Sequence, residues 1–269
     1  MPEPSTLMPV ALAGLALIAV LALSTWVASL LRHDVSLVDR MWAPMIAGAA
    51  LVYACETGWR GARAVALVAL LLAWGLRLAW YITRRNWGHG EDRRYQAIRA
   101  RNQPHFALKS LLLVFALQML LAWIVSAPAL VAVVGGAPLG IADAAGLALA
   151  GAGLAFEALA DAQMARFKAD PANRGRVMDR GPWRYSRHPN YFGEACVWWG
   201  VWLVALGAAG GGALWTVVSP LLMTVLLLKV SGVTLLEKDI GERRPAYRDY
   251  VARTNAFVPG PPRRARSRA

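Results

Sequence analysis

Residues 184–194 read Arg-Tyr-Ser-Arg-His-Pro-Asn-Tyr-Phe-Gly-Glu, and this polar stretch runs directly into an apolar segment that continues to Leu206. Such a junction is typical of a basic loop that enters a membrane helix. Its polar groups are costly to desolvate beside an apolar segment unless a ligand binds them. We interpret the stretch as a site for an aromatic cofactor that carries phosphate. The alternative is a belt of Arg and Tyr side chains at the membrane surface.

Apolar blocks make up most of the 269-residue chain, of which 57% is hydrophobic. A bilayer core needs about 20 apolar residues per helix, and several blocks reach this length. The sequence therefore predicts an all-α, polytopic membrane helical bundle. We expect seven transmembrane helices, over residues 8–31, 41–56, 64–82, 110–134, 141–156, 190–206 and 214–236. Glu157, Asp161, Arg166 and Lys168 are expected to mark the exit of the fifth helix into water.

The distribution of basic residues predicts the orientation of these helices. All Lys and Arg residues fall on one side of the seven-helix arrangement, except Arg60, Arg63, Arg77 and Lys229. The positive-inside rule makes that side cytoplasmic, which places the N-terminus outside and the C-terminus inside. The net charge of +13 then indicates contact with anionic membrane lipids and not with nucleic acid.

The remaining bulk features predict a simple organisation. We expect one membrane domain over residues 1–262 and a basic, disordered tail over residues 263–269. Cys55 and Cys196 are predicted near opposite membrane faces, so no disulfide is expected between them. No metal-ligand spacing is present, and no metal site is predicted.

Three polar blocks, residues 84–95, 161–187 and 237–247, fall on the predicted cytoplasmic side. The chain contains no G-x-G-x-x-G turn and no P-loop. A nucleotide would therefore be held by side chains from several helices.

Two of these stretches carry a family resemblance. Residues 90–95, Gly-Glu-Asp-Arg-Arg-Tyr, and residues 187–194, Arg-His-Pro-Asn-Tyr-Phe-Gly-Glu, resemble blocks of the steroid 5α-reductase family, most closely its bacterial membrane branch. The resemblance covers residues 157–259 well and the first half loosely. It implies a seven-helix enzyme of the bacterial inner membrane that uses NADPH to reduce the activated C=C bond of a steroid or another hydrophobic enone.

The resemblance also implies the residues of a cytoplasmic cofactor site. Lys168 stands where the animal enzymes have arginine, and Glu237 stands where they have histidine. A 2′-phosphate and a pyrophosphate require basic side chains, and residues 161–194 are rich in them. For this reason we add further basic and polar residues to those that the resemblance implies. The expected NADPH-binding residues are Arg77, Arg85, Arg94, Asp161, Lys168, Arg176, Tyr185, Arg187, His188, Asn190, Glu194 and Glu237.

Two acids compete as the group that polarises the substrate carbonyl. The resemblance favours Glu56, although the family's Gln-Glu pair reads Cys55-Glu56 here and its helper tyrosine has Trp74 as its nearest equivalent. Asp39 is the rival, and on a regular helix it would lie roughly 25 Å from Glu56, so only one of them can act. The alternatives are a helix cap or ion pair for Asp39 and a membrane-boundary position for Glu56. We expect Trp42, Tyr53 and Trp74 to contact the hydrophobic substrate.

A second enzyme class shares part of the pattern. Isoprenylcysteine carboxyl methyltransferases and phospholipid methyltransferases have an Arg-His-Pro-x-Tyr-x-Gly segment similar to residues 187–193, and they bind S-adenosylmethionine. The basic residues upstream, Arg85, Arg94, Lys168 and Arg176, favour a cofactor with phosphates. A third possibility is a non-enzymatic membrane protein with a basic surface, which would not explain the compact His/Asn/Tyr/Glu cluster.

Overall fold

The computed structural model describes residues 4–230 and 246–263, and every regular element among them is a helix. The contacts divide the chain into two compact units. Unit 1 comprises residues 1–147 and 201–219, and unit 2 comprises residues 148–200 and 220–269.

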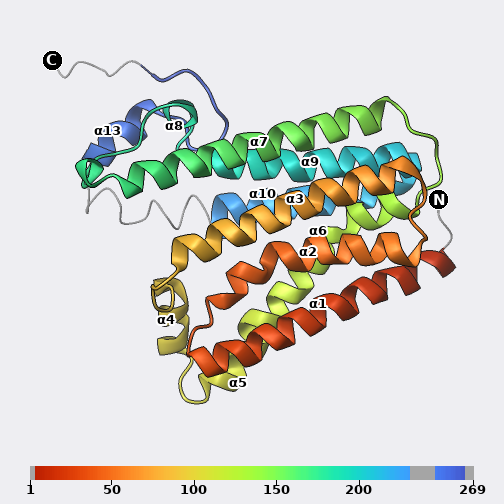
Figure 1. Cartoon of the computed structure of the whole chain (residues 1–269), viewed down its shortest axis with the longest axis horizontal. Helices are drawn as coiled ribbons and strands as arrows, with labels where there is room; N and C mark the ends of the chain where they lie inside the picture. The colour runs from red at the N-terminus through yellow and green to blue at the C-terminus, as the bar shows by residue number, and fades with distance from the viewer. Residues whose placement is uncertain (1–3, 231–245, 264–269) are drawn as a thin grey trace. The chain divides into compact units, whose positions relative to one another are not determined.

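Unit 1 is organised around α2 (Leu37–Glu56), which packs against α1 (Pro4–Arg32), α3 (Gly61–Asn86) and α6 (Leu117–Val134). α1 and α2 lie side by side and run in opposite directions (Figure 1). Many buried positions of α2 are alanines, including Ala43, Ala47 and Ala50. Small side chains allow helix backbones to approach closely, so α2 can occupy the centre of the unit.

The clearest close approach in unit 1 lies between α1 and α2. The ring of Tyr53 packs against Gly14 so tightly that a Cβ atom on Gly14 would overlap the ring. The Tyr53 hydroxyl and the Ser126 Oγ of α6 are 2.8 Å apart and share a buried hydrogen bond. Gly14 therefore makes room for a side chain that links α1, α2 and α6.

The polar connection between α3 and α6 is itself partly helical. It forms α4 (Arg93–Arg101) and α5 (Phe106–Ser110), and a π-helical segment, η1 (Leu111–Ala116), joins α5 to α6. The Asp92 carboxylate accepts a hydrogen bond from the Arg94 amide at 2.9 Å and so caps α4. In Figure 1, α4 and α5 lie at the end of unit 1 where α1 ends and α2 begins.

Unit 2 contains the later part of α7 (Ile141–Ala169) and the first part of α9 (Pro189–Ala209). The short helices η2 (Pro171–Asn173) and α8 (Pro182–Tyr185) lie between them in the chain. Beyond α9, η3 (Gly210–Val217) belongs to unit 1, whereas most of α10 (Val218–Val225), η4 (Leu226–Val230) and α13 (Ala246–Arg253) belong to unit 2.

One sequence prediction about α7 is wrong. Glu157 and Asp161 do not mark an exit into water, because they are only 2% and 3% exposed and α7 continues as a regular helix to Ala169. The reason is that both acids lie on the side of α7 that packs against α9.

Within residues 4–230 and 246–263, five helical segments are long and apolar enough to cross a membrane: residues 7–32, 61–86, 106–134, 141–169 and 189–229. The prediction of an all-α membrane protein is thereby confirmed. The chain is an integral membrane protein.

Candidate functional site

The central feature of unit 2 is a row of buried polar side chains between α7 and α9, which we call the α7–α9 seam. It consists of Glu157 and Asp161 on α7 and Asn190 and Glu194 on α9. The three acids are each no more than 6% exposed. Three buried acids on two neighbouring helices are unusual and make the seam the first candidate for a site.

Two glycines set the register of the seam. A Cβ atom on Gly153 would lie 2.6 Å from the Gly193 carbonyl oxygen, and one on Gly193 would lie 2.7 Å from the Gly153 carbonyl oxygen. The two backbones therefore approach as closely as glycine permits. Residues 157 and 161 follow Gly153 at helical intervals of four, so the same face of α7 brings both acids to α9.

Asn190 is the best-defined polar group of the seam. Its Nδ2 donates a hydrogen bond to Asp161 Oδ1 at 3.1 Å. Its Oδ1 is buried and accepts no hydrogen bond from any residue that the structure describes. Asp161 thus fixes the orientation of the amide and leaves an acceptor for the amine or amide of a ligand.

The residues just before α9 are held by the C-terminal helix. The Tyr250 hydroxyl of α13 donates to the carbonyl oxygens of Trp183 and Ser186. Arg187 Nη1 donates to the carbonyl oxygens of Thr254, at 2.6 Å, and Val251. An arginine at the end of a helix also interacts favourably with the helix dipole, so Arg187 has a structural role at α13.

His188 completes this segment. It is 5% exposed, and its ring stacks on that of Tyr191 with centroids 5.5 Å apart and planes 1° apart. The stack lies at the first turn of α9, next to Asn190. The structure therefore brings together four of the predicted cofactor residues: Asp161, His188, Asn190 and Glu194.

The other predicted cofactor residues of unit 2 lie outside this buried group. Lys168, Arg176 and Tyr185 are exposed on or beside the connection from α7 to α9. Lys168 and Arg176 carry the charge type that binds phosphate groups. Glu237 lies outside the described residues.

A second polar cluster lies in unit 1, where α4 meets the start of α2. Asp39 accepts hydrogen bonds from the Tyr95 hydroxyl at 2.7 Å and from Arg94 Nη2 at 2.8 Å. Arg94 also pairs with Asp92 at 3.0 Å. We call Asp39, Arg94 and Tyr95 the Asp39 cluster.

The electrostatics of this cluster are unusual for surface groups. Burial raises the pKa of Asp39 above its ordinary value, although Arg94 and the Tyr95 hydroxyl act in the opposite direction. Burial and the neighbouring Asp39 carboxylate also raise the pKa of Tyr95. Acids with raised pKa values are frequent at functional sites.

The remaining predicted residues of unit 1 are dispersed. Glu56 is exposed at the C-terminal end of α2, and Arg85 is exposed near the end of α3, where its Nε donates to Asn86. Arg77 is half-buried on α3. Asp39 is the more enclosed of the two candidate acids.

The three predicted substrate residues do not line one common pocket. Tyr53 lines an apolar cavity in unit 1, whereas Trp42 and Trp74 do not line it. Trp74 is fully buried on α3 and Trp42 is half-buried on α2.

Sequence reasoning missed two residues that the structure brings to these sites. Glu157 belongs to the seam, and its position four residues after Gly153 and four before Asp161 was a signal on one helix face. Tyr95 belongs to the Asp39 cluster, and its only sequence signal was the Gly-Glu-Asp-Arg-Arg-Tyr block. No group of three metal-ligating side chains lies together among residues 4–230 and 246–263.

Comparisons with known proteins extend across both units. An uncharacterized protein of Schizosaccharomyces pombe, C594.04c, is 26% identical over an alignment that covers 91% of this chain and 78% of the yeast protein. No solved structure matches the chain. A family model described as a protein of unknown function (DUF1295) matches residues 25–254. Because this match spans most of the chain, the protein belongs to the DUF1295 family.

Proposed function

We propose that the protein is an NADPH-dependent membrane ene-reductase that reduces the activated C=C bond of a hydrophobic enone. The observation that carries the proposal is the open acceptor of Asn190, buried at the α7–α9 seam and oriented by Asp161. The loose relation between DUF1295 and steroid-reductase-like proteins supports the same reading.

The residues of unit 2 fit the parts of this cofactor. Asn190 Oδ1 would accept a hydrogen bond from the nicotinamide carboxamide or the adenine amine. Asp161 and Glu194 would repel phosphate, so we assign them to ribose hydroxyls. Lys168 and Arg176 would bind the phosphates, including the 2′-phosphate that distinguishes NADPH from NADH. NADPH, when bound, supplies the hydride.

For the acid that polarises the substrate carbonyl, we propose Asp39 in preference to Glu56. A carboxyl group whose pKa is raised is a better candidate for an acid role than an ordinary exposed one. Burial raises the pKa of Asp39, whereas Glu56 is exposed at the end of its helix. Tyr95 and Arg94 would hold the Asp39 side chain in position.

We also propose seven membrane crossings, with the N-terminus outside and the cofactor site facing the cytoplasm. Residues 189–229 form a 41-residue apolar run, which would extend about 60 Å as one helix, twice the thickness of a hydrocarbon core. Gly210, with a φ of +54°, supplies a turn within this run. α2 would provide the remaining crossing.

An S-adenosylmethionine-dependent methyltransferase is the second candidate. The observation that favours it is the number of buried acids in the seam, Glu157, Asp161 and Glu194, because carboxylates attract a sulfonium cation and repel phosphate.

A binding comparison tests the two proposals. Thermal unfolding of the detergent-purified protein would be followed with NADPH, NADH and S-adenosylmethionine at equal concentrations. A ligand at 100 times its Kd stabilises a protein by about 2.7 kcal/mol. We expect stabilisation by NADPH and a smaller effect of NADH. Stabilisation by S-adenosylmethionine alone would refute the reductase and support the methyltransferase.

Variants locate the site. Asn190→Ala should reduce the NADPH-dependent shift, because the amide contact is lost. Asn102→Ala is the matched control, since this asparagine lies in unit 1, where its Nδ2 donates to the carbonyl oxygen of Ile98. Asp39→Asn should keep the NADPH shift and slow enone reduction; if Glu56→Gln alone slows it, our choice of acid is wrong.

A further inference from the structure

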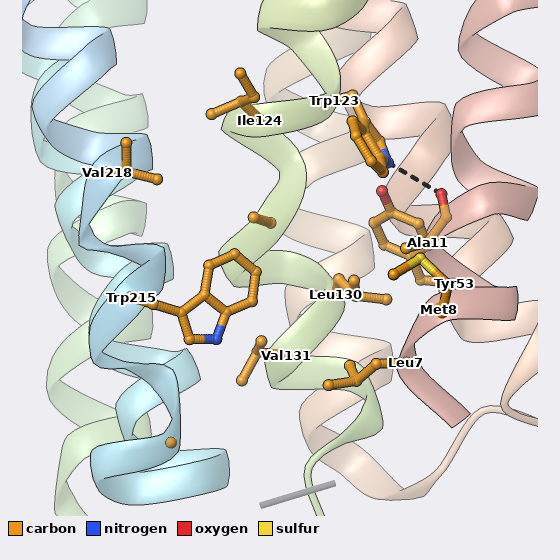
Figure 2. A pocket seen from close by; sticks show the side chains of 12 residues that line it. Leu7, Met8, Ala11, Tyr53, Trp123, Ile124, Leu130, Val131, Trp215 and Val218 are labelled. Atoms are coloured by element: carbon orange, nitrogen blue, oxygen red, sulfur yellow. Dashed lines mark hydrogen bonds between the residues drawn. The ribbon is translucent and has the colours of Figure 1, made fainter. Parts of the chain in front are cut away.

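Unit 1 contains an apolar cavity of about 620 Å³, which is within the range of small-molecule sites. Its walls come from α1, α2, α6 and the segment η3 to α10 (Figure 2). Met8, Tyr53, Trp123, Leu130 and Trp215 are among the residues that line it.

The chemistry of the walls selects an apolar ligand. None of the twelve lining residues carries a charge. The Tyr53 hydroxyl shares its hydrogen bond with Ser126, and Trp123 Nε1 donates to the Ala11 carbonyl oxygen at 3.0 Å, as Figure 2 shows. These polar groups are already satisfied within the protein. A charged ligand would therefore lose hydration without compensation.

The rim of the cavity indicates where the ligand comes from. Met8, Trp215 and Val218 line the cavity and remain 58%, 55% and 44% exposed. All three lie in segments that are apolar enough to cross a membrane. An opening bordered by exposed apolar side chains in such segments suits a ligand that enters sideways from the bilayer.

The cavity is separate from the Asp39 cluster. Tyr53 follows Asp39 by 14 positions on the same helix, which corresponds to a separation of about 21 Å along its axis. Glu56 is not among the lining residues. Neither candidate acid thus belongs to this cavity, and its ligand need not react.

We propose that this cavity binds one hydrocarbon chain of a bilayer lipid. The chain fills the space between α1, α6 and η3 and stabilises their packing. This role is independent of the proposed reductase activity.

Photocrosslinking tests the assignment. The protein would be reconstituted in vesicles of phosphatidylcholine and phosphatidylglycerol that contain a phosphatidylcholine with a diazirine in the middle of one acyl chain. After illumination, mass spectrometry would locate the adducts. We expect adducts enriched at Met8, Trp123 and Leu130 relative to Leu112, a position 72% exposed outside the cavity. Equal labelling at all four positions would overturn the proposal.

A filling variant provides the second readout. Ala127→Phe places a ring in the cavity and should reduce adducts at Met8 and Leu130 to the level at Leu112. Ala73→Phe is the matched control, because Ala73 is exposed on α3 and does not line the cavity. Unchanged adducts in a folded Ala127→Phe protein would refute the site. If Ala127→Phe does not fold, the adduct pattern of the wild-type protein still tests whether the cavity holds a lipid chain.

If the cavity instead held the enone substrate of the proposed reductase, an added enone would compete with the labelled lipid. Testosterone, added as an enone probe, should leave the adducts unchanged if the cavity holds a lipid chain. Its displacement of the labelled lipid would overturn our assignment and identify a substrate pocket. NADPH binding is measured separately, so failure of one proposal does not decide the other.

Discussion

Arg63 and Asp143 form a buried ion pair, and breaking it should strongly destabilise the protein. Arg63, in the first turn of α3, is 6% exposed, and Asp143, in the first turn of α7, is 2% exposed. Arg63 Nε and Nη2 donate to the two carboxylate oxygens at 2.6 and 3.0 Å. Its Nη1 and Nη2 also donate to the carbonyl oxygens of Ala137 and Pro138.

The substitution Arg63→Met removes one charge and leaves Asp143 buried. Loss of one partner of a buried pair costs about 3–5 kcal/mol, because the remaining charge is uncompensated. For a chain of this size about 2–4 °C of Tm corresponds to each kcal/mol, so the Tm should fall by roughly 6–20 °C. Differential scanning fluorimetry in detergent would measure it.

Two further variants separate the charge effect from loss of the side chain. Arg60→Met is the matched control, because Arg60 is exposed and should have little effect on Tm. The double variant Arg63→Met, Asp143→Leu removes both charges and should recover a large part of the lost Tm. The Tm should stay somewhat below that of the wild type, because the carbonyl oxygens of Ala137 and Pro138 lose their hydrogen bonds from Arg63. A double variant as unstable as Arg63→Met alone would refute the reasoning.

Three smaller predictions concern other contacts. Burial raises the pKa of Glu91, but hydrogen bonds from Arg99 and the Val35 amide outweigh it and hold this pKa below its ordinary value. Glu91→Gln should therefore lower the free energy of unfolding by about 1–2 kcal/mol at pH 7. The deficit should shrink as the pH falls through this lowered pKa, because wild-type Glu91 is then protonated; an equal Tm difference at pH 7 and pH 3 would contradict this. Gly193→Ala should lower Tm and weaken the NADPH-dependent stabilisation, since the new Cβ would lie 2.7 Å from the Gly153 carbonyl oxygen. Gly151→Ala should do neither, because a Cβ atom on Gly151 would meet open space. Tyr250→Phe removes the hydroxyl that holds Trp183 and Ser186, so trypsin should cleave after Arg184 faster than in the wild type.

The Asp39 cluster shows where sequence reasoning reaches its limit. The sequence identifies Asp39 as a candidate acid, but its hydrogen-bond partner Tyr95 lies 56 positions away. No local pattern specifies such a pairing. It depends on how α4 folds back against the start of α2, which packing decides.

The same limit applies to the α7–α9 seam and to the buried ion pair. Asp161, His188, Asn190 and Glu194 were predicted as cofactor residues and do gather in unit 2, although their role remains a prediction. The sequence predicts Glu157 in water, because charged residues usually lie where a helix leaves the membrane. From the sequence, Arg63 is one of four basic residues that do not fall on the cytoplasmic side, and its pairing is not indicated because Asp143 lies 80 positions away.

The sequence by itself determined the class of protein, the long apolar segments that form its helices and the polar stretch before α9. These features follow from local composition, since a run of about 20 apolar residues is stable in a bilayer only as a helix. Only the tertiary structure decided that Glu157 and Asp161 are buried, that Arg63 pairs with Asp143 and that Tyr53 lines an apolar cavity. The physical reason is that burial and pairing are properties of the helix faces that meet, and these faces are fixed by close packing at small residues such as Gly14, Gly153 and Gly193.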